Sequence, residues 1–482
     1  MEWISRATEP VNAFVWGPVM LLLLLGAGLY FTVGTGFLQL RRLGTIFRKT
    51  FGTLGRATGG KDGITPFQAV STALASTMGT GNIVGVATAL TAGGPGAVFW
   101  MWISALLGMM TKYAEVVIAL HTRQRNDKGQ WAGGPMYAIR YGMGKRWGWL
   151  AALFCVFGML ASLGSGNMAQ VNSMAGALEN AFRIPPTATA LLSLCAVGLV
   201  IFGGIRSIAQ VAEKVIPFLS VVYTVGALAV IVFHYRHVGP ALASIWEGAF
   251  GWRAAAGGAL GYTLSQALRT GLSRGVFSNE AGLGSAPIAH AAAEVRDPVE
   301  QGFWGAVEVF ADTIVVCTIT ALAILTAGLY AGPGSLNGAA LTSASFATLF
   351  GPAGPVIVAV SVALFAYSSI IGWSYYGEKC CEYLFCRSHS KHSSSRAEKR
   401  RSSGKLPLFL YKFVFLCALW PGATGDITRV WNVADTFNGL MAVPNLVSLL
   451  ALSGVVFRLT RQYLRGPEAA ARPARAGRPR QK

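Results

Sequence analysis

The sequence has few charged residues, and acidic ones are especially scarce. Charged residues make up 12% of its 482 residues, with 20 Asp and Glu against 40 Lys and Arg, whereas soluble domains carry roughly a quarter. Hydrophobic residues reach 53% and the mean hydropathy is +0.49. Apolar runs of about 20 residues recur along the chain. The composition therefore argues against a soluble domain and predicts an all-α polytopic membrane protein.

Signatures of several enzyme classes are missing from the sequence. The chain has no H-E-x-x-H zinc motif, no ligand spacing among its six His, and no G-x-x-x-x-G-K-[ST] phosphate loop for ATP-driven transport. The stretch GLSRG at 271–275 matches G-x-S-x-G, but no predicted strand precedes it and no triad context surrounds it. We treat that match as chance, and we expect neither an enzyme nor a cofactor.

The placement of the seven Cys and of the net charge of +20 argues against zinc sites, disulfides and nucleic-acid binding. The Cys lie in apolar runs or beside a basic loop, without zinc-type spacing and in a setting where disulfides are not expected. The basic residues gather in a few loops and the tail, and no nucleic-acid-binding motif accompanies them. We therefore predict the lipid bilayer, and no nucleic acid, as a partner.

Apolar windows between polar breaks predict about eleven membrane spans. Lys and Arg concentrate after the first span, at 122–146, at 386–405 and from 458 onward. Eleven spans place all four regions on one side, which the positive-inside rule makes cytoplasmic. We expect a multi-pass protein of a bacterial-type inner (plasma) membrane with its N-terminus outside and its C-terminus inside. The predicted spans are 11–36, 66–91, 95–121, 147–180, 187–204, 209–234, 259–292, 301–331, 352–385, 406–421 and 428–459.

Ten spans remain after the first, which predicts two halves of five in opposite orientations. Inverted repeats of this kind are typical of secondary transporters. We assign 1–62 to an extra N-terminal helix and its cytoplasmic loop, 63–235 to the first repeat and 236–459 to the second. Residues 460–482 are predicted to form a basic, disordered cytoplasmic tail. The role of the basic loop 386–405 stays open.

Both predicted repeats open with an interrupted span. The first contains STMGTGNIVG at 76–85, with Gly79 and Gly81, and the second contains FSNEAGLGSAP at 277–287, with Gly282 and Gly284. Matching interruptions in two halves indicate a substrate site near the bilayer midplane. Freed N–H groups there suit a carboxylate, whereas carbonyls and an Asn side-chain oxygen suit a small cation. The alternative is a close-packing glycine face.

Several polar side chains lie within predicted spans, where they are costly and default to a function or an internal partner. Lys112 and Glu115 are three residues apart on one helix and could pair with each other. Asp312 has no obvious local partner and is a candidate functional residue. In a separate span, Asn167 and Gln170 are one turn apart and are predicted to share a face.

Glu280 lies inside the second interruption. It could pair with Arg269 or Arg274, which are close to it in sequence, as a gate or a structural ion pair.

Seven stretches of the sequence resemble one family, the alanine or glycine:cation symporters, which are sodium:amino-acid carriers with a LeuT-type fold. They run in order from about residue 65 to 455 and cover most of the chain. They are GTGNIVGVATAL, GGPGAVFWMW, TKYAEVVIA, GGPMYAI, FSNEAGLGSAPIAHAAA, IIGWSYYGEKC and VADTFNGLMAVPNL.

The resemblance implies sodium-driven import of small neutral amino acids by alternating access, with L-alanine and glycine as substrates and D-alanine as a further candidate. A LeuT-type fold implies a 5+5 inverted repeat whose two interrupted helices hold the substrate. Carried onto this chain, the implied substrate-binding residues are Gly79, Thr80, Gly81, Asn82, Gln170, Phe277, Ser278, Asn279 and Gly282.

The resemblance also implies a sodium site that bridges the first and eighth core helices. Its ligands would be carbonyls near Ala75 and Met78 and the hydroxyls of Ser368 and Ser369. The alternative for the two Ser is a hydrogen bond to their own helix backbone. Other functions stay open: a proton-coupled carrier and, more remotely, a channel or receptor for the same ligands. Oligomeric state and substrate preference are outside what the sequence indicates.

Overall fold

The computed structural model describes residues 10–12, 14–53, 63–126, 129–250, 260–330, 336–386 and 405–465. Within these ranges the chain is almost entirely helical, as the composition predicts. The exception is a short hairpin, in which β1 (Gln124–Arg125) pairs antiparallel with β2 (Trp131–Ala132). Most of the basic loop 386–405 and of the basic tail lies outside the described residues. Residues 460–465 are helical, so the prediction of a disordered tail from 460 is wrong up to Arg465.

The helices of the N-terminal part follow the predicted spans closely. Gly148–Phe182 is one long helical segment with a π-helical stretch, η5, in its middle. The elements are α2 (Pro18–Gly34), α3 (Leu38–Arg41), α4 (Leu43–Thr50), α5 (Pro66–Thr77), η2 (Thr80–Asn82), α6 (Val84–Gly93), α7 (Gly96–Thr122), α8 (Pro135–Tyr137), α9 (Gly148–Leu163), η5 (Gly164–Met168), α10 (Ala169–Phe182), α11 (Pro186–Ile201) and α12 (Gly204–Phe233).

The C-terminal part begins with a peripheral helix and then repeats the plan of an interrupted helix followed by long ones. A further π-helical stretch, η8, interrupts the segment from Pro298 to Thr326. The elements are α13 (Val238–Phe250), α14 (Leu260–Asn279), α15 (Ala286–His290), α16 (Pro298–Val309), η8 (Phe310–Cys317), α17 (Thr318–Thr326), α18 (Gly338–Phe350), α19 (Ala353–Phe385), α21 (Lys405–Cys417), α22 (Leu419–Thr424), α23 (Ile427–Ala451) and α24 (Ser453–Arg465).

Seven helical segments in the described part are long and apolar enough to cross a membrane. They correspond to seven of the eleven predicted spans. The other four correspond to α2 and α11, which are 17 and 16 residues long, and to the interrupted pairs α5–α6 and α14–α15. The fold class is confirmed, while the total of eleven spans and the division into repeats stay predictions.

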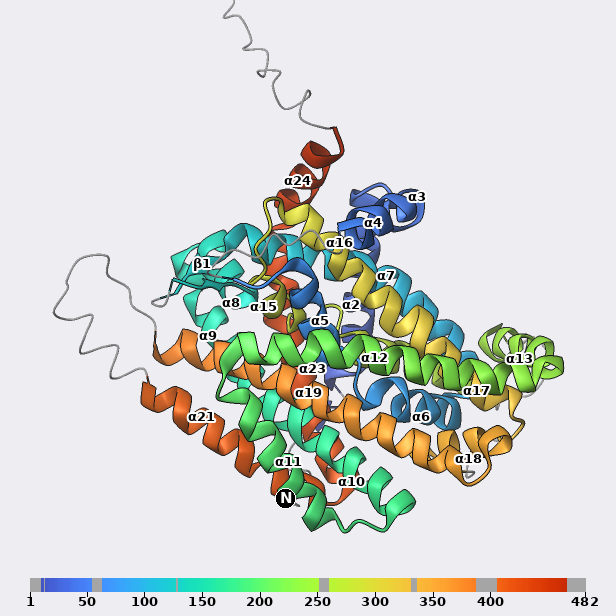
Figure 1. The fold of residues 1–482 in the computed structure, drawn as a ribbon. Helices are drawn as coiled ribbons and strands as arrows, with labels where there is room; N and C mark the ends of the chain where they lie inside the picture. Colours follow the sequence, from blue (N-terminus) through green and yellow to red (C-terminus); the bar gives the residue numbers. More distant parts are fainter. Residues whose placement is uncertain are drawn as a thin grey trace, which may run out of the picture.

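The two interrupted helices lie in the interior of the helical bundle. Helix α5 packs against α12, α15 and α19, and α14 packs along α6 and α7. Figure 1 shows α7 and α16 running side by side, with the hairpin and α8 at one end of the bundle and α13 and α18 at the other. The breaks therefore lie where side chains from many helices can reach them.

The first interruption has a clear local cause. Helix α5 begins with a capping box between Thr65 and Gln68 and a Pro at its first turn. It ends at Thr77, and Gly79 adopts an extended conformation with φ −117° and ψ −146°. A short 3-10 turn follows before α6 starts at Val84. The chain is thus unwound at the Gly-Thr-Gly-Asn stretch, as predicted.

The second interruption is sharper and contains three residues with positive φ. Glu280, Gly282 and Gly284 have φ values of 55°, 94° and 84°. Only Gly adopts such values readily, and a Glu there is uncommon. The backbone conformation therefore requires Gly at both positions of the Gly-x-Gly pattern. The next helix, α15, begins at Ala286 with Pro287 in its first turn.

Candidate functional site

The first break is bound by a side chain from the long α9–α10 segment. The Gln170 Oε1 atom accepts hydrogen bonds from the Thr80 backbone N–H at 3.2 Å and from the Thr80 hydroxyl at 3.1 Å. A Cβ at Gly79 would lie 2.8 Å from the same Oε1 atom and would overlap the Ser369 hydroxyl. Gly79 is therefore needed so that the backbone can approach Gln170 and Ser369 closely.

Asp312 joins the first break to the second. The Asn82 Nδ2 atom donates to the Asp312 carboxylate at 2.7 Å and to its backbone carbonyl at 3.1 Å. Ser278, near the end of α14, donates from its hydroxyl to the other carboxylate oxygen at 2.7 Å. The Thr313 hydroxyl donates to that oxygen at 2.8 Å. Asp312, which the sequence marks as a candidate functional residue, is therefore bound by two residues that are distant in sequence, Asn82 and Ser278.

All members of this cluster are buried, and one buried oxygen lacks a partner. Asn82, Asp312 and Thr313 are fully buried and Ser278 is 1% exposed. The Asn82 Oδ1 atom has no hydrogen-bond partner within the described residues, although buried polar atoms in proteins are usually paired. The Cys317 thiol lies 3.4 Å from both Asn82 Nδ2 and Ser278 Oγ. Neither Cys317 nor Thr313 was predicted, because nothing in the sequence marks them.

Two π-helical stretches place the site residues. Asp312, Thr313 and Cys317 lie in η8, and Gln170 follows directly after η5. Such stretches often occur at functional sites because they break the regular helical hydrogen-bond pattern. Asn167 bonds a neighbouring helix, because its Nδ2 atom donates to the Phe415 carbonyl on α21 at 2.6 Å, whereas Gln170 binds the first break.

The two predicted Ser ligands of sodium behave differently. The Ser369 hydroxyl donates across to the Ser76 carbonyl, at the end of α5, at 3.1 Å. The Ser368 hydroxyl donates to the Phe365 carbonyl of its own helix at 2.7 Å, which is the alternative that the sequence left open. Ala75 and Met78 are buried nearby on α5 and at its end. The structure thus brings Ser369 to the first break and gives Ser368 a local partner.

The second break is held by a carboxylate of the protein itself. The Glu115 Oε1 atom on α7 accepts from the N–H groups of Gly282 at 3.1 Å and Gly284 at 3.0 Å. Asn445 donates to the same oxygen at 2.6 Å and to the Gly282 carbonyl at 2.9 Å. Gly282 was predicted to bind the substrate. In this arrangement its N–H group is bound by Glu115 and its carbonyl by Asn445, so neither backbone group is free. Asn279 is also engaged, with Thr313 and with the Ala281 N–H.

The predicted ion pairs of the buried charges are wrong in their partners. Glu280 accepts from the Trp373 indole at 3.0 Å and from the Ser285 hydroxyl, rather than from an Arg. Lys112 pairs with Glu308 on α16 at 3.4 Å, and Glu115 binds the second break instead.

Glu308 has a further buried partner on the second interrupted helix. It also contacts the His290 Nε2 atom at 2.9 Å, and the His290 Nδ1 atom lies 2.8 Å from the Gln301 amide. These residues are all fully buried. They tie α7 and α16 to α15.

An aromatic pair covers the site on one side. The Phe277 ring lies 5.3 Å from the Trp431 ring of α23, centroid to centroid. The Arg274 guanidinium lies 5.6 Å and 5.7 Å from these two ring centroids, a distance at which cation–π attraction operates. Phe277, predicted as a substrate-binding residue, therefore precedes Ser278 of the Asp312 cluster in the chain, and its ring contacts Trp431 and Arg274.

Two interrupted helices that meet at a buried polar cluster define a secondary transporter of the LeuT type. Among solved structures, MhsT in complex with L-phenylalanine is similar with a TM-score of 0.53 at 14% identity, over 84% of this chain and 99% of that chain. This likeness establishes the fold alone.

The chain belongs to the sodium:alanine symporter family. The family profile matches residues 1–476. The sodium/alanine symporter AgcS of Methanococcus maripaludis is 44% identical over 470 residues, which cover 96% of this chain and 98% of the relative. A relative from Bacillus subtilis, described as the probable sodium/glutamine symporter GlnT, is 38% identical over 465 residues, or 96% and 91% of the two chains. The protein is therefore a cation-coupled amino-acid symporter of the membrane, and the predicted resemblance is confirmed.

Proposed function

We propose that the protein imports small neutral amino acids, with alanine and glycine as substrates, together with Na⁺. The observation that carries this proposal is the buried cluster of Asn82, Ser278 and Asp312, which links both helix breaks. The name of the most similar relative quoted above supports alanine and sodium as the cargo. The protein would act in the plasma membrane with its N-terminus outside and its basic loops in the cytoplasm.

The substrate carboxylate would bind at the first break. There the Thr80 N–H and hydroxyl are bound by the neutral Gln170 amide oxygen, which a carboxylate can replace with a stronger, charge-assisted hydrogen bond. Gly81 faces the second break, because a Cβ on it would meet the Ser278 Cα at 3.6 Å. A substrate between the two breaks would thus contact both repeats, with Gln170 and Phe277 as walls. The narrow space at Gly81 favours a small side chain on the substrate.

One sodium ion would bind beside Asn82 and Asp312. The unpartnered Asn82 Oδ1 atom, the Asp312 carboxylate and the Ser278 and Thr313 hydroxyls are hard oxygen donors, which suit a small cation. A second cation position would lie between α5 and α19, with the Ser369 hydroxyl and carbonyls at the end of α5 as donors. Sodium there would join the interrupted helix to a long helix of the second half.

A proteoliposome uptake assay tests the proposal. Radiolabelled alanine should accumulate under an inward Na⁺ gradient, and the accumulation should vanish when K⁺ replaces Na⁺. Uptake that ignores Na⁺ and follows an inward proton gradient would establish the proton-coupled alternative instead. Passive equilibration without accumulation would favour a channel. An excess of unlabelled glycine should compete with alanine, whereas aspartate should not.

A further inference from the structure

The cytoplasmic ends of the two interrupted helices, on the predicted topology, are joined by backbone hydrogen bonds. Ile64, just before α5, forms an isolated parallel β-bridge with Ala293, just after α15. The Ile64 N–H donates to the Ala292 carbonyl at 3.3 Å, and the Glu294 N–H donates to the Ile64 carbonyl at 2.9 Å. Ile64 and Ala293 are 3% and 0% exposed. The helices that hold the proposed site are therefore fastened together at one end.

A single arginine reinforces this junction. The Arg123 guanidinium, at the end of α7, donates to the carbonyls of Ala291 at 3.2 Å, Ala293 at 2.6 Å and Val295 at 3.3 Å. These carbonyls belong to the segment that follows α15 and carries the bridge. Burial lowers the pKa of Arg123 to about 10, so the side chain stays charged at neutral pH. Its three hydrogen bonds hold the segment after α15 with which Ile64 pairs.

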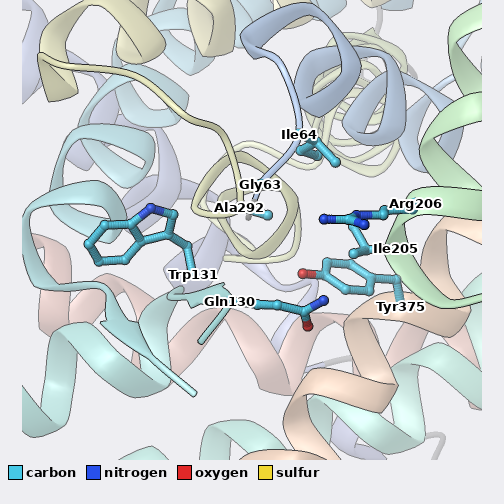
Figure 2. Close-up of a pocket in the computed structure, with 8 residues that line it drawn as sticks. All are labelled: Gly63, Ile64, Gln130, Trp131, Ile205, Arg206, Ala292 and Tyr375. Atoms are coloured by element: carbon cyan, nitrogen blue, oxygen red, sulfur yellow. The ribbon is translucent and has the colours of Figure 1, made fainter. Parts of the chain in front are cut away.

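The hairpin β1–β2 covers the arginine. The Arg123 guanidinium lies 4.2 Å from the Trp131 ring centroid, and a Cβ on Gly133 would press against the Ala291 Cβ. Figure 2 shows a pocket beside the junction, in which Trp131 lies next to Ala292 and Gly63 lies close to Ala292. Ile205 of α12 and Tyr375 of α19 line its other side. Residues of the junction, Ile64 and Ala292, thus form part of the wall of this pocket.

We propose that Arg123 and the Ile64–Ala293 bridge form the cytoplasmic gate of the transporter. The inference rests on the proposed function, because an importer must release its cargo toward this end. While the bridge is formed, α5 cannot separate from α15 and the buried cluster stays closed to the cytoplasm. Release would require the two hydrogen bonds of Ile64 to break and the segment that follows α15 to leave Arg123. Two backbone bonds and the bonds of one arginine are few enough to break in each cycle, because the net contribution of a single hydrogen bond to stability is modest.

Cross-linking tests the bridge. We would introduce Ile64→Cys and Ala293→Cys together, after replacing Cys195, Cys386 and Cys417, which are not buried, with Ser. Oxidation should reduce Na⁺-driven alanine uptake more than tenfold, while Na⁺-dependent alanine binding stays within about twofold. A reductant should restore uptake. The matched control is Gln124→Cys with Ala132→Cys, a pair across the β1–β2 hairpin, whose oxidation should leave uptake unchanged.

A labelling assay tests Arg123 without relying on transport. A single Ala293→Cys reporter, in the protein with Cys195, Cys386 and Cys417 replaced with Ser, should react slowly with a membrane-impermeant maleimide while Arg123 is kept. Arg123→Ala should accelerate the reaction about tenfold or more, and Arg123→Lys, which keeps the charge but not the fork of donors, should fall between. Equal labelling rates in all three, or full uptake by the cross-linked pair, would overturn the gate. If the unchanged protein shows no alanine uptake but labelling changes as expected, the proposed function fails and the gate stands.

Discussion

The two helix breaks look alike in sequence and differ in what binds them. Each contains Gly-x-Gly within an apolar span. The first is bound by a neutral amide, since Gln170 accepts from Thr80. The second is bound by a buried carboxylate, since Glu115 accepts from the N–H groups of Gly282 and Gly284. A carboxylate thus already accepts from the backbone N–H groups of the second break, whereas at the first break a neutral amide oxygen accepts from the Thr80 N–H.

This difference assigns different tasks to the breaks. The second break is a fixed structural turn, whose freed N–H groups are satisfied within the protein. The first break holds its N–H groups with a weaker partner that an incoming carboxylate can displace. Similar glycine patterns therefore do not imply equal ligands. The proposed position of the substrate carboxylate is therefore the first break, at the N–H groups of Thr80 and Gly81.

Removing the carboxylate at the second break should have the largest effect. Glu115→Ala leaves two N–H groups and the Asn445 amide without their acceptor, and each buried donor left without a partner costs about 1–3 kcal/mol. We expect a clear drop in the thermal unfolding temperature and no uptake. Glu115→Gln, which keeps an acceptor oxygen, should be milder. An Ala variant with the original unfolding temperature would show that the second break keeps its conformation without the Glu115 carboxylate.

Substitutions in the Asp312 cluster should stop transport with less effect on folding. Asn82→Ala should reduce alanine uptake about tenfold or more, because it removes both the link to Asp312 and the unpartnered oxygen. Asp312→Asn should raise the Na⁺ concentration for half-maximal uptake about tenfold, since the cation loses a charged ligand. Tryptophan fluorescence and size-exclusion profiles check folding. Unchanged Na⁺ dependence in Asp312→Asn would remove this carboxylate from the ion site.

Loss of the amide at the first break should weaken substrate binding. Gln170→Ala should raise the KM for alanine about five- to tenfold, because the Thr80 segment loses the amide that positions it before the substrate binds, and hydrogen bonds of roughly 1–1.5 kcal/mol correspond to a change of this size. The maximal rate should change less, because Gln170 holds the break in place and does not span the two halves. Gln170→Glu is the sharper variant: its charge should compete with the substrate carboxylate and raise KM further. A lower KM in that variant would contradict a carboxylate site at Thr80.

The smallest expected effect is a difference in Na⁺ dependence between variants of two adjacent residues, Ser368 and Ser369. Ser369→Ala should raise the Na⁺ concentration for half-maximal uptake about threefold, because its hydroxyl reaches α5. Ser368→Ala should change it little, because that hydroxyl bonds its own helix. The two variants differ by one position and serve as matched controls. Equal effects would show that the α5–α19 contact has no special part in ion binding.

The sequence predicts the helical class, the family and the position of both breaks, because glycine, polarity and hydropathy are local properties. It also marks Asp312 as a costly buried charge. The partners of the buried charges are not local. Lys112 and Glu115 are close enough to pair on one helix, yet Glu308 and the N–H groups of the second break bind them. Asp312 meets Asn82 across 230 residues, and Asn167 meets the Phe415 carbonyl across 248 residues.

A structure of the protein with Na⁺ and alanine bound, determined by electron cryomicroscopy, tests the difference between the breaks most directly. We expect density for the alanine carboxylate within hydrogen-bond distance of the Thr80 and Gly81 N–H groups, with Gln170 displaced and Glu115 still bound to Gly282 and Gly284. Carboxylate density at Gly282 and Gly284, with Glu115 moved away, would contradict the account.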